Sequence, residues 1–542
     1  MSNNRCHKPA GSLSRPRRLN AGWAARIVPG LLMLLALGGC IKNDIPYPRI
    51  QPNFVTVEAD GLLKPAEIDS ANRLVTLVFD ETVNIRSVEI TSYTLTPGAR
   101  LVEGNLDQPL DLSKYFICTL GLYQDYDWVI RGEQTIERYF TVENQVGASV
   151  IDVGGRRVKV EVSSANGGLK AVKVLTAKLG PAGSTVTPSL AGETIDLTSP
   201  LEVTLTAYGE DVTWTIFGEE VTSNVQTVRA DAWTNVAWIY GAGIDGADNG
   251  VEYRLYGTQE WQKAPAGWIT NTGGTFNARL TGLNPETEYE ARAYSGEEFG
   301  ETVRFTTGSI VQLPNSDFEN WSENGKIWQP WAEGATPYWD TGNKGATTLG
   351  SSNVLPTNST STGTGRAAML KTEFKGIGMI GKLAAGSIFA GVYLRTDGTN
   401  GILSFGREFT QRPTRLRGYF NYKTAPISKT NTQFKDLMGE PDTCIVWCAL
   451  IDAPQPFECR TNPNNLNLFN PSGADVIAYG KMQCGEDVPQ YVPFEITLDY
   501  TSTSRVPRYI LVVASSSKYG DYFTGGEGAV MCLDDLELLY DY

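Results

Sequence analysis

Short runs of alternating apolar and polar residues recur along the chain, and turn residues separate one run from the next. The 56 glycines and 28 prolines supply many of these turns. No long stretch shows the 3.6-residue apolar period of an amphipathic helix. Alternation of this kind predicts β-strands that have one face in a core and the other in solvent. We therefore expect an all-β protein of several domains.

An internal repeat predicts the first two domains. The stretches DLSKYFICTLGLYQDYDWVIRGE and DLTSPLEVTLTAYGEDVTWTIFGE align at an offset of about 85 residues, the length of a small β-sandwich. We expect the aligned aromatic residues to lie in the cores; they are Trp128 with Trp214 and Tyr123 with Tyr208. Two immunoglobulin-like repeats are therefore predicted, over residues 52–138 and 139–222.

A third module is predicted over residues 223–308. The stretch ARLTGLNPETEYEARAYS resembles the fibronectin type III pattern, with Tyr289 placed to form a tyrosine corner. Trp238, in NVAWIY, is expected to be the buried tryptophan of its second strand. Such a module predicts a role as a spacer or in interaction, and no chemistry.

Residues 309–542 form one further predicted unit, which is long for a single sandwich. Strand candidates such as TCIVWCALI and RYILVVASS alternate with loops rich in Gly, Ser, Thr and Asn. We expect a jelly roll with insertions.

Three stretches of this unit carry a family resemblance: NSDFENW, FTQRPTRLRGYFNYK and SSSKYGDYFTGGEGAVMCLDDLELLY, in that order. On them the unit resembles the putative carbohydrate metabolism domain found at the C-terminus of Bacteroidales lipoproteins. The resemblance implies a galactose-binding-like jelly roll that immunoglobulin-like modules precede. It implies a role in carbohydrate metabolism without specifying a reaction.

A tryptophan-rich segment, FENWSENGKIWQPWAEGATPYW, opens the unit. Indoles in a Gly-, Pro- and Asn-rich loop favour a platform for a sugar ring, with a core position as the alternative. We expect at least one of the four indoles in the core and at least one exposed beside Arg412 or Tyr422. The predicted ligand-binding residues, each with a structural role as the alternative, are Trp321, Trp328, Trp331, Trp339, Arg412, Tyr419, Tyr422 and Asp521.

A structural calcium ion is the one metal that the sequence suggests. Jelly-roll carbohydrate-binding modules often hold calcium between a Phe-Glu strand near the start and an Asp near the end. Glu319 and Asp535 match these two places, and carbonyl oxygens would complete the six to eight ligands that calcium takes. The alternative is a solvated pair of surface carboxylates. No cofactor is required for the predicted function.

The first 39 residues have the pattern of an export signal. Six Lys and Arg residues, and no acidic residue, accompany an apolar stretch from Ile27 to Leu37 that is too short to span a bilayer. The sequence LGGC then resembles a bacterial lipobox, so we predict that Cys40 carries a lipid and that residues 40–51 are a tether. We expect a cell-envelope protein, anchored by lipid alone, in the outer membrane. A plain secretory signal is the alternative.

The net charge, the single histidine and the few cysteines limit which partners and reactions are possible. Removing the signal changes the formal net charge from −14 to −20, because six of the 46 Lys and Arg are lost and all 60 acidic residues stay. This acidity disfavours nucleic acid and anionic lipid as partners and suits a neutral ligand. The single histidine, His7, lies in the signal, which excludes Ser-His-Asp and Cys-His catalysis in the mature chain. The six cysteines after Cys40 are expected to be buried free thiols, with a Cys459–Cys484 bridge as the alternative.

Three functions follow from these observations. The favoured one is a non-catalytic lipoprotein whose jelly roll binds a glycan, for carbohydrate capture or utilisation. The second is a structural or adhesive surface protein that binds protein partners. The third is a glycoside hydrolase, which needs two carboxylates roughly 5 to 9.5 Å apart. The sequence does not mark any two acids as that pair.

Overall fold

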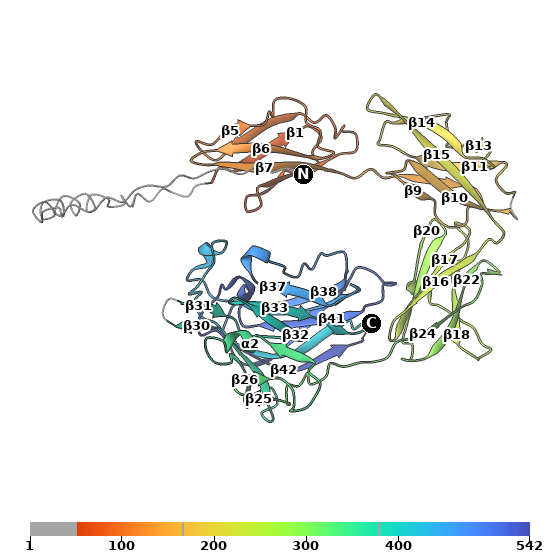
Figure 1. The fold of residues 1–542 in the computed structure, drawn as a ribbon. Helices are drawn as coiled ribbons and strands as arrows, with labels where there is room; N and C mark the ends of the chain where they lie inside the picture. Colours follow the sequence, from red (N-terminus) through yellow and green to blue (C-terminus); the bar gives the residue numbers. More distant parts are fainter. Residues whose placement is uncertain (1–50, 165–166, 378–379, 542) are drawn as a thin grey trace, which may run out of the picture. The chain divides into compact units, whose positions relative to one another are not determined.

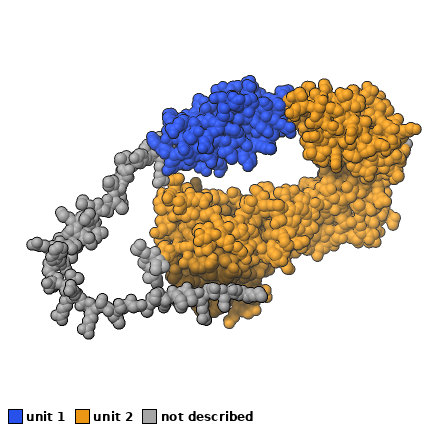
Figure 2. All heavy atoms as spheres, turned by 45° about the horizontal axis from the view of Figure 1, so that its top comes forward, with its two compact units in different colours: residues 1–135 blue, residues 136–542 orange. Residues whose placement is uncertain are grey.

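The computed structural model describes residues 51–164, 167–377 and 380–541. The predicted signal, Cys40 and nearly all of the tether lie outside these residues. The chain divides into two compact units, residues 1–135 and 136–542 (Figure 2). Almost every element is a β-strand, so the all-β, multidomain prediction is confirmed. Within the described ranges, no helix is both long and apolar enough to cross a bilayer.

The first unit is a β-sandwich built around Trp128. This side chain is fully buried, its Nε1 donates to the Pro52 carbonyl at 3.1 Å, and its ring meets Phe54 edge-on at 5.3 Å. The indole thus joins the β1–β4 pair to a five-stranded sheet in the order β2-β3-β7-β6-β5. The strands are β1 (Phe54–Ala59), β2 (Glu67–Asp69), β3 (Leu74–Phe79), β4 (Ile90–Leu95), β5 (Arg100–Glu103), β6 (Tyr115–Gly121) and β7 (Asp125–Gln134).

The second repeat has the same strand pairing as the first. β10 (Arg157–Ser163) runs parallel to β15 (Glu210–Val221), as β3 does to β7, and β14 (Leu201–Ala207) pairs antiparallel with β15, as β6 does with β7. Trp214 is buried, as Trp128 is. The remaining strands are β8 (Tyr139–Val142), β9 (Val150–Asp152), β11 (Val172–Lys178), β12 (Thr185–Thr187) and β13 (Thr194–Ile195).

The core position predicted for the aligned tyrosines is wrong. Tyr123 and Tyr208 are 63% and 39% exposed. Each lies in the tight turn between the two paired strands, where side chains point into solvent. The alignment therefore marks a shared turn at these positions.

The third module contains the predicted tyrosine corner. Tyr289 is buried, and its hydroxyl accepts a hydrogen bond from the Asn284 amide at 3.0 Å. Trp238 is only half-buried, which corrects the sequence prediction: Ala237 and Ile239 face the core, so Trp238 between them faces the other side. The strands are β16 (Gln226–Ala232), β17 (Val236–Ala242), β18 (Asn249–Leu255), β19 (Gln262–Lys263), β20 (Ile269–Thr272), β21 (Thr275–Thr281), β22 (Glu288–Ser295), β23 (Glu298–Phe299) and β24 (Val303–Thr306).

The C-terminal domain packs two sheets around a common core (Figure 1). The larger sheet has the order β37-β33-β32-β41-β36-β38-β40, with β27 and β34 beside it, and the smaller has the order β28-β29-β42-β35-β39. The larger sheet is made of β27 (Trp339–Thr341), β32 (Ser387–Asp397), β33 (Asn400–Phe405), β34 (Arg407–Glu408), β36 (Cys444–Ile451), β37 (Phe457–Arg460), β38 (Val476–Cys484), β40 (Asp499–Tyr500) and β41 (Tyr509–Ser515). The smaller is made of β28 (Val354–Thr357), β29 (Ala367–Lys371), β35 (Arg415–Lys423), β39 (Val488–Thr497) and β42 (Val530–Leu539).

The larger sheet is covered by apolar side chains on both faces. Along β36, Val446 and Cys448 point into the core between the sheets, whereas Trp447 and Ala449 join a second apolar cluster on the opposite face. This arrangement explains why CIVWCALI is apolar without interruption. The second cluster gives the sheet a protein-covered outer face, on which a pocket can form.

All six cysteines in the described residues are free thiols, and five of them are buried. Cys459 lies in β37 and Cys484 in β38, which four other strands of the larger sheet separate. The alternative bridge between these two cysteines is therefore wrong.

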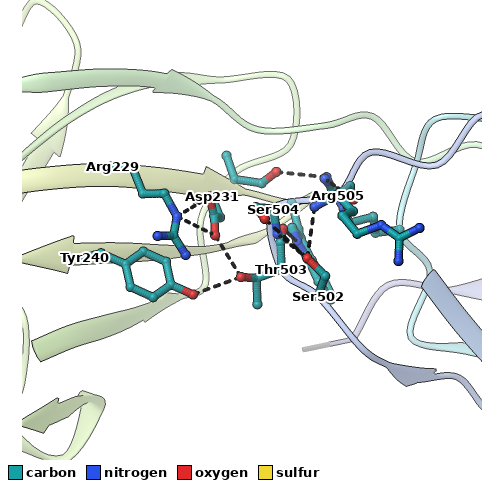
Figure 3. Close-up of polar contacts among 10 residues, drawn as sticks. Arg229, Asp231, Tyr240, Ser502, Thr503, Ser504 and Arg505 are labelled. Carbon is teal, nitrogen blue, oxygen red and sulfur yellow. Dashed lines mark hydrogen bonds and ion pairs between the residues drawn. The ribbon is translucent and has the colours of Figure 1, made fainter. Parts of the chain in front are cut away.

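The third module and the C-terminal domain meet at a polar junction (Figure 3). The Thr503 hydroxyl donates to Asp231 Oδ2 at 2.8 Å and lies 2.9 Å from the Tyr240 hydroxyl. Trp233 is 5% exposed, and its Nε1 donates to the Thr503 carbonyl at 2.9 Å. Its ring centroid is 4.3 Å from that of Tyr500. The module is thus held to the domain by both apolar and polar contacts.

We predict that Trp233→Ala separates the unfolding of the third module from that of the C-terminal domain. The substitution removes a buried indole, a loss of about 3 kcal/mol, most of it from contacts across the junction. Differential scanning calorimetry should show the module melting at lower temperature than the domain. Trp261→Ala, in the same module and away from the junction, is the matched control. Equal effects of the two substitutions would contradict the prediction.

Candidate functional site

A pocket of about 200 Å³ lies on the outer face of the larger sheet. Residues of β32, β33, β36 and β41 form its floor, and segments 382–385 and 515–523 contribute walls. Its apolar part belongs to the second cluster, so the sheet supports it from below. The charged residues that line it are Lys375, Lys382, Lys518 and Asp521.

Trp447 gives the pocket a rigid aromatic side. Phe469 stacks on the indole with ring centroids 4.9 Å apart and an angle of 9° between the planes. Phe405 meets it edge-on at 6.1 Å. These contacts fix the ring, and the part of Trp447 that they leave uncovered borders the pocket. A fixed aromatic surface of this kind suits the apolar face of a sugar ring.

A buried carboxylate, Asp442, holds the loop that carries the polar groups. Its side chain accepts hydrogen bonds from the Ser517 hydroxyl at 2.5 Å and from the Gly526 amide at 2.7 Å. The Thr443 amide donates to its other oxygen at 2.7 Å. Asp442 is 1% exposed, and burial raises the pKa of its carboxyl while these hydrogen bonds lower it. The loop from 517 to 526 is thereby fixed at both ends.

Asp521 projects into the pocket from the short 3₁₀ helix Gly520–Tyr522. Asp521 is exposed to the solvent of the pocket. Although the residue is exposed, partial desolvation of its carboxyl by neighbouring residues raises the pKa of Asp521 to about 6. Such a carboxylate accepts hydrogen bonds at neutral pH and donates one when protonated, and both states suit sugar hydroxyls.

Lys382 reaches the pocket from β31 (Ile380–Ala384), which pairs with β30 (Glu373–Ile377). Its Nζ donates to Asn400 Oδ1 at 2.6 Å and lies 3.9 Å from the ring centroid of Phe523. Phe523 itself has a left-handed backbone, with φ of 54°, which is rare for a large side chain. Strained conformations of this kind are enriched at functional sites.

The structure places two of the four predicted platform tryptophans in the core. Trp321 is 8% exposed and donates to the Phe318 carbonyl, and Trp339 is 1% exposed and donates to the Pro314 carbonyl. With their N–H groups paired and their rings packed, these indoles cannot stack on a ligand, so the prediction is wrong for both. Trp328 and Trp331 are half-buried and lie outside the pocket lining.

Two further predicted contacts are structural. Tyr422 is 1% exposed, and its hydroxyl donates to the Ser516 carbonyl. Arg412 is 8% exposed and donates to the carbonyls of Arg505 and Ala232 at the junction with the third module. Both predictions as ligand-binding residues are therefore wrong.

Two of the predicted positions are exposed to solvent. Tyr419 is 40% exposed on β35 and lies outside the pocket lining. Asp521 is the predicted ligand-binding residue that the structure does place in the pocket.

Glu319 and Asp535 both hydrogen-bond to the segment 361–366. Glu319 accepts from the Arg366 amide at 2.9 Å, and Asp535 accepts from the Ser361 hydroxyl at 2.5 Å. The described residues contain no group of three or more His, Cys, Asp or Glu side chains that could hold a metal. Two carboxylates that hydrogen-bond to one segment are compatible with a site that carbonyls would complete, and calcium there stays a prediction.

The other pocket residues were not singled out by sequence patterns. A lysine in a hairpin, such as Lys382, has no signature that separates it from a solvated surface charge. Trp447 had one usable signal, since it alternates with Val446 and Cys448 in an entirely apolar strand. That pattern indicates a strand buried on both faces, and hence an aromatic residue beneath a second layer.

Comparison with known proteins identifies the C-terminal domain. Residues 317–539 match the family model described as "Putative carbohydrate metabolism domain", which confirms the resemblance carried by the three stretches. The match supports a carbohydrate-related role for this domain. A search of curated proteins found no match for the chain.

Solved structures that match this chain include two described as putative glycoside hydrolases. One, from Bacteroides thetaiotaomicron VPI-5482, is 14% identical with a TM-score of 0.30, and the alignment covers 92% of this chain and 99% of that one. The other, from Bacteroides vulgatus ATCC 8482, is 22% identical with a TM-score of 0.32, covering 41% of this chain and 96% of that one. The insect immune protein hemolin is 10% identical with a TM-score of 0.16, covering 47% and 78%.

We predict that Asp521 makes stability depend on pH between about 4 and 6. Its folded-state pKa of about 6 lies above the ordinary value of 3.8, so the folded chain holds the proton more tightly. Its ionisation therefore costs no stability below pH 3.8, costs more as the pH rises toward 6, and has a constant cost above that. Melting temperatures of Asp521→Asn and the wild type should diverge across this window, with the variant the more stable at pH 7. Glu527→Gln, in the same loop, is the control, and a difference that is independent of pH would contradict the assignment.

Proposed function

Because residues 317–539 carry a putative carbohydrate metabolism domain, we propose that the C-terminal domain binds a glycan in the pocket beside Trp447. The observation that supports this most is the convergence of a fixed indole with Asp521 and Lys382 in one pocket. Sugar rings have apolar faces and hydroxyl-bearing edges, so stacking and hydrogen bonding together give both affinity and orientation. Binding of this kind requires no cofactor.

We further propose that the protein is a lipid-anchored component of the cell envelope, in the outer membrane, with Cys40 as the lipidated residue. The basic N-terminus, the short apolar stretch and the LGGC sequence support this. The immunoglobulin-like repeats and the third module then lie between the anchor and the glycan-binding domain. Their role in this proposal is that of a spacer.

Glycan binding by the pocket predicts a specific loss in Trp447→Ala. Removing the indole deletes the stacking surface, and affinity should fall roughly tenfold or more. Affinity gel electrophoresis of the full-length protein against pectin, xylan, mixed-linkage β-glucan and mucin, followed by calorimetry on the retarding glycan, measures the change.

Trp331→Ala is the matched control, because Trp331 is a half-buried tryptophan of the same domain outside the pocket. Loss of binding in this control instead would place the platform in the tryptophan-rich segment. No retardation by any of these glycans would favour the adhesive alternative. Release of reducing sugar that Asp521→Asn abolishes would favour the hydrolase alternative.

The lipid anchor is tested separately from the pocket. Cys40→Ala removes the thiol that would carry the lipid, so the protein should move from the membrane fraction to the soluble fraction of cells. Without this thiol no acyl chain is attached at residue 40. Because lipid is the only proposed anchor, the shift should be nearly complete. Cys118→Ala, which changes a buried thiol of the first repeat, controls for loss of any cysteine. Membrane association of Cys40→Ala equal to that of the wild type would contradict the proposal.

A further inference from the structure

The pocket carries a local excess of positive charge in an acidic protein. The whole chain has a formal net charge of −14, yet three lysines and one aspartate are the charged residues of the described pocket lining. Lys375 is neutralised by Glu373, at 2.6 Å. Lys382 and Lys518 are then opposed by Asp521 alone, which leaves one unit of positive charge when all three groups are ionised.

Lys382 is placed to meet an anion. Its partners, the Asn400 side-chain oxygen and the Phe523 ring, are both neutral, so the ammonium group keeps its full charge. Burial lowers the pKa of Lys382, because the pocket removes part of the water that stabilises the cation. An anion in the pocket would restore this stabilisation.

The backbone of Lys518 is held in place, and no acidic side chain in the described ranges pairs with its ammonium group. Its backbone amide donates to the Thr443 carbonyl at 2.7 Å, and the preceding Ser517 is anchored on Asp442. Its Nζ lies 5.0 Å from the ring centroid of Tyr519. Across the described parts of the chain, neither Lys518 nor Lys382 forms a salt bridge.

We propose that the pocket selects a sugar unit that bears an anionic group, a carboxylate or a sulfate, and that Lys382 and Lys518 bind this group. The inference rests on the proposed glycan-binding function and adds the charge of the ligand to it. An anionic ligand replaces the neutral ligand that the net charge of the whole chain predicted. Salt screens the charges on the protein surface over about 10 Å, whereas charged groups in contact inside a pocket are screened much less. Charge-assisted hydrogen bonds then supply the selectivity, and Trp447 packs against the ring.

Calorimetry on the full-length protein with four oligosaccharides of equal length tests the inference. They are an oligogalacturonate, its fully methyl-esterified form, a neutral galacto-oligosaccharide and a sulfated galacto-oligosaccharide. The first two share one sugar backbone and differ in whether each carboxylate is free or methyl-esterified, and we expect the acid to bind about tenfold more tightly than the ester at low salt. The preference should shrink as salt is added. The sulfated probe distinguishes a general anion site from one shaped for a carboxylate.

Lys382→Met and Lys518→Met should each weaken binding of the anionic sugar about tenfold and weaken binding of the ester far less. Lys423→Met, an exposed lysine of the smaller sheet, is the matched control, and melting temperatures check that each variant is folded. Equal affinity for acid and ester, or anion binding that neither pocket substitution alters, would overturn the inference and leave glycan binding intact. Failure of the wild type to bind any of the four, and of the polysaccharides above, would overturn the proposed function itself.

Discussion

The pocket depends on one buried carboxylate, Asp442. A charge taken out of water is costly unless hydrogen bonds replace its hydration, and Ser517, Gly526 and Thr443 donate those bonds. Ser517 and Gly526 lie at the two ends of the loop that carries Lys518 and Asp521. A Cβ at Gly525 would lie 2.9 Å from the Asp442 oxygen, so the backbone approaches the carboxylate as only glycine allows. The carboxylate and the loop therefore stabilise each other, and these contacts fix the positions of Lys518 and Asp521 in the pocket.

The second requirement is a sheet with two covered faces. A jelly roll normally buries one face of each sheet and leaves the other to solvent. Here the larger sheet has a further apolar cluster on its outer face, which includes Phe389, Phe405 and Trp447. That cluster supports the pocket floor without drawing on the core between the sheets. The core-facing and pocket-facing side chains of β36 are thus separated on alternate residues of the same strand.

Sequence patterns predicted the strands and several buried aromatic residues, because these depend on nearby residues. The patterns did not predict side-chain positions that depend on contacts between distant segments. Alternation marked the strands, the Tyr289 corner followed from a short motif, and the buried Trp128 and Trp214 followed from the alignment of the two repeats. Asp521 could be found because its loop has an unusual composition. Arg412 could not be placed, because its partners Ala232 and Arg505 lie 180 and 93 residues away. The pairing of Trp321 and Trp339 with backbone carbonyls likewise depends on the folded loop, which decided between core and platform for both indoles.

The contacts along the second unit bear on how the pocket is presented. The Gly147 amide donates to the Gly243 carbonyl at 3.0 Å between the second repeat and the third module. The Trp233–Thr503 junction joins the third module to the C-terminal domain, and the Ser309 amide between them donates to Gln411 at 3.1 Å. Each connection thus includes hydrogen bonds between folded elements. A stiff support loses less conformational freedom when a polysaccharide binds than a jointed one would. Under the proposed glycan-binding function, contacts at these junctions would lower this cost by restricting the movement of the modules.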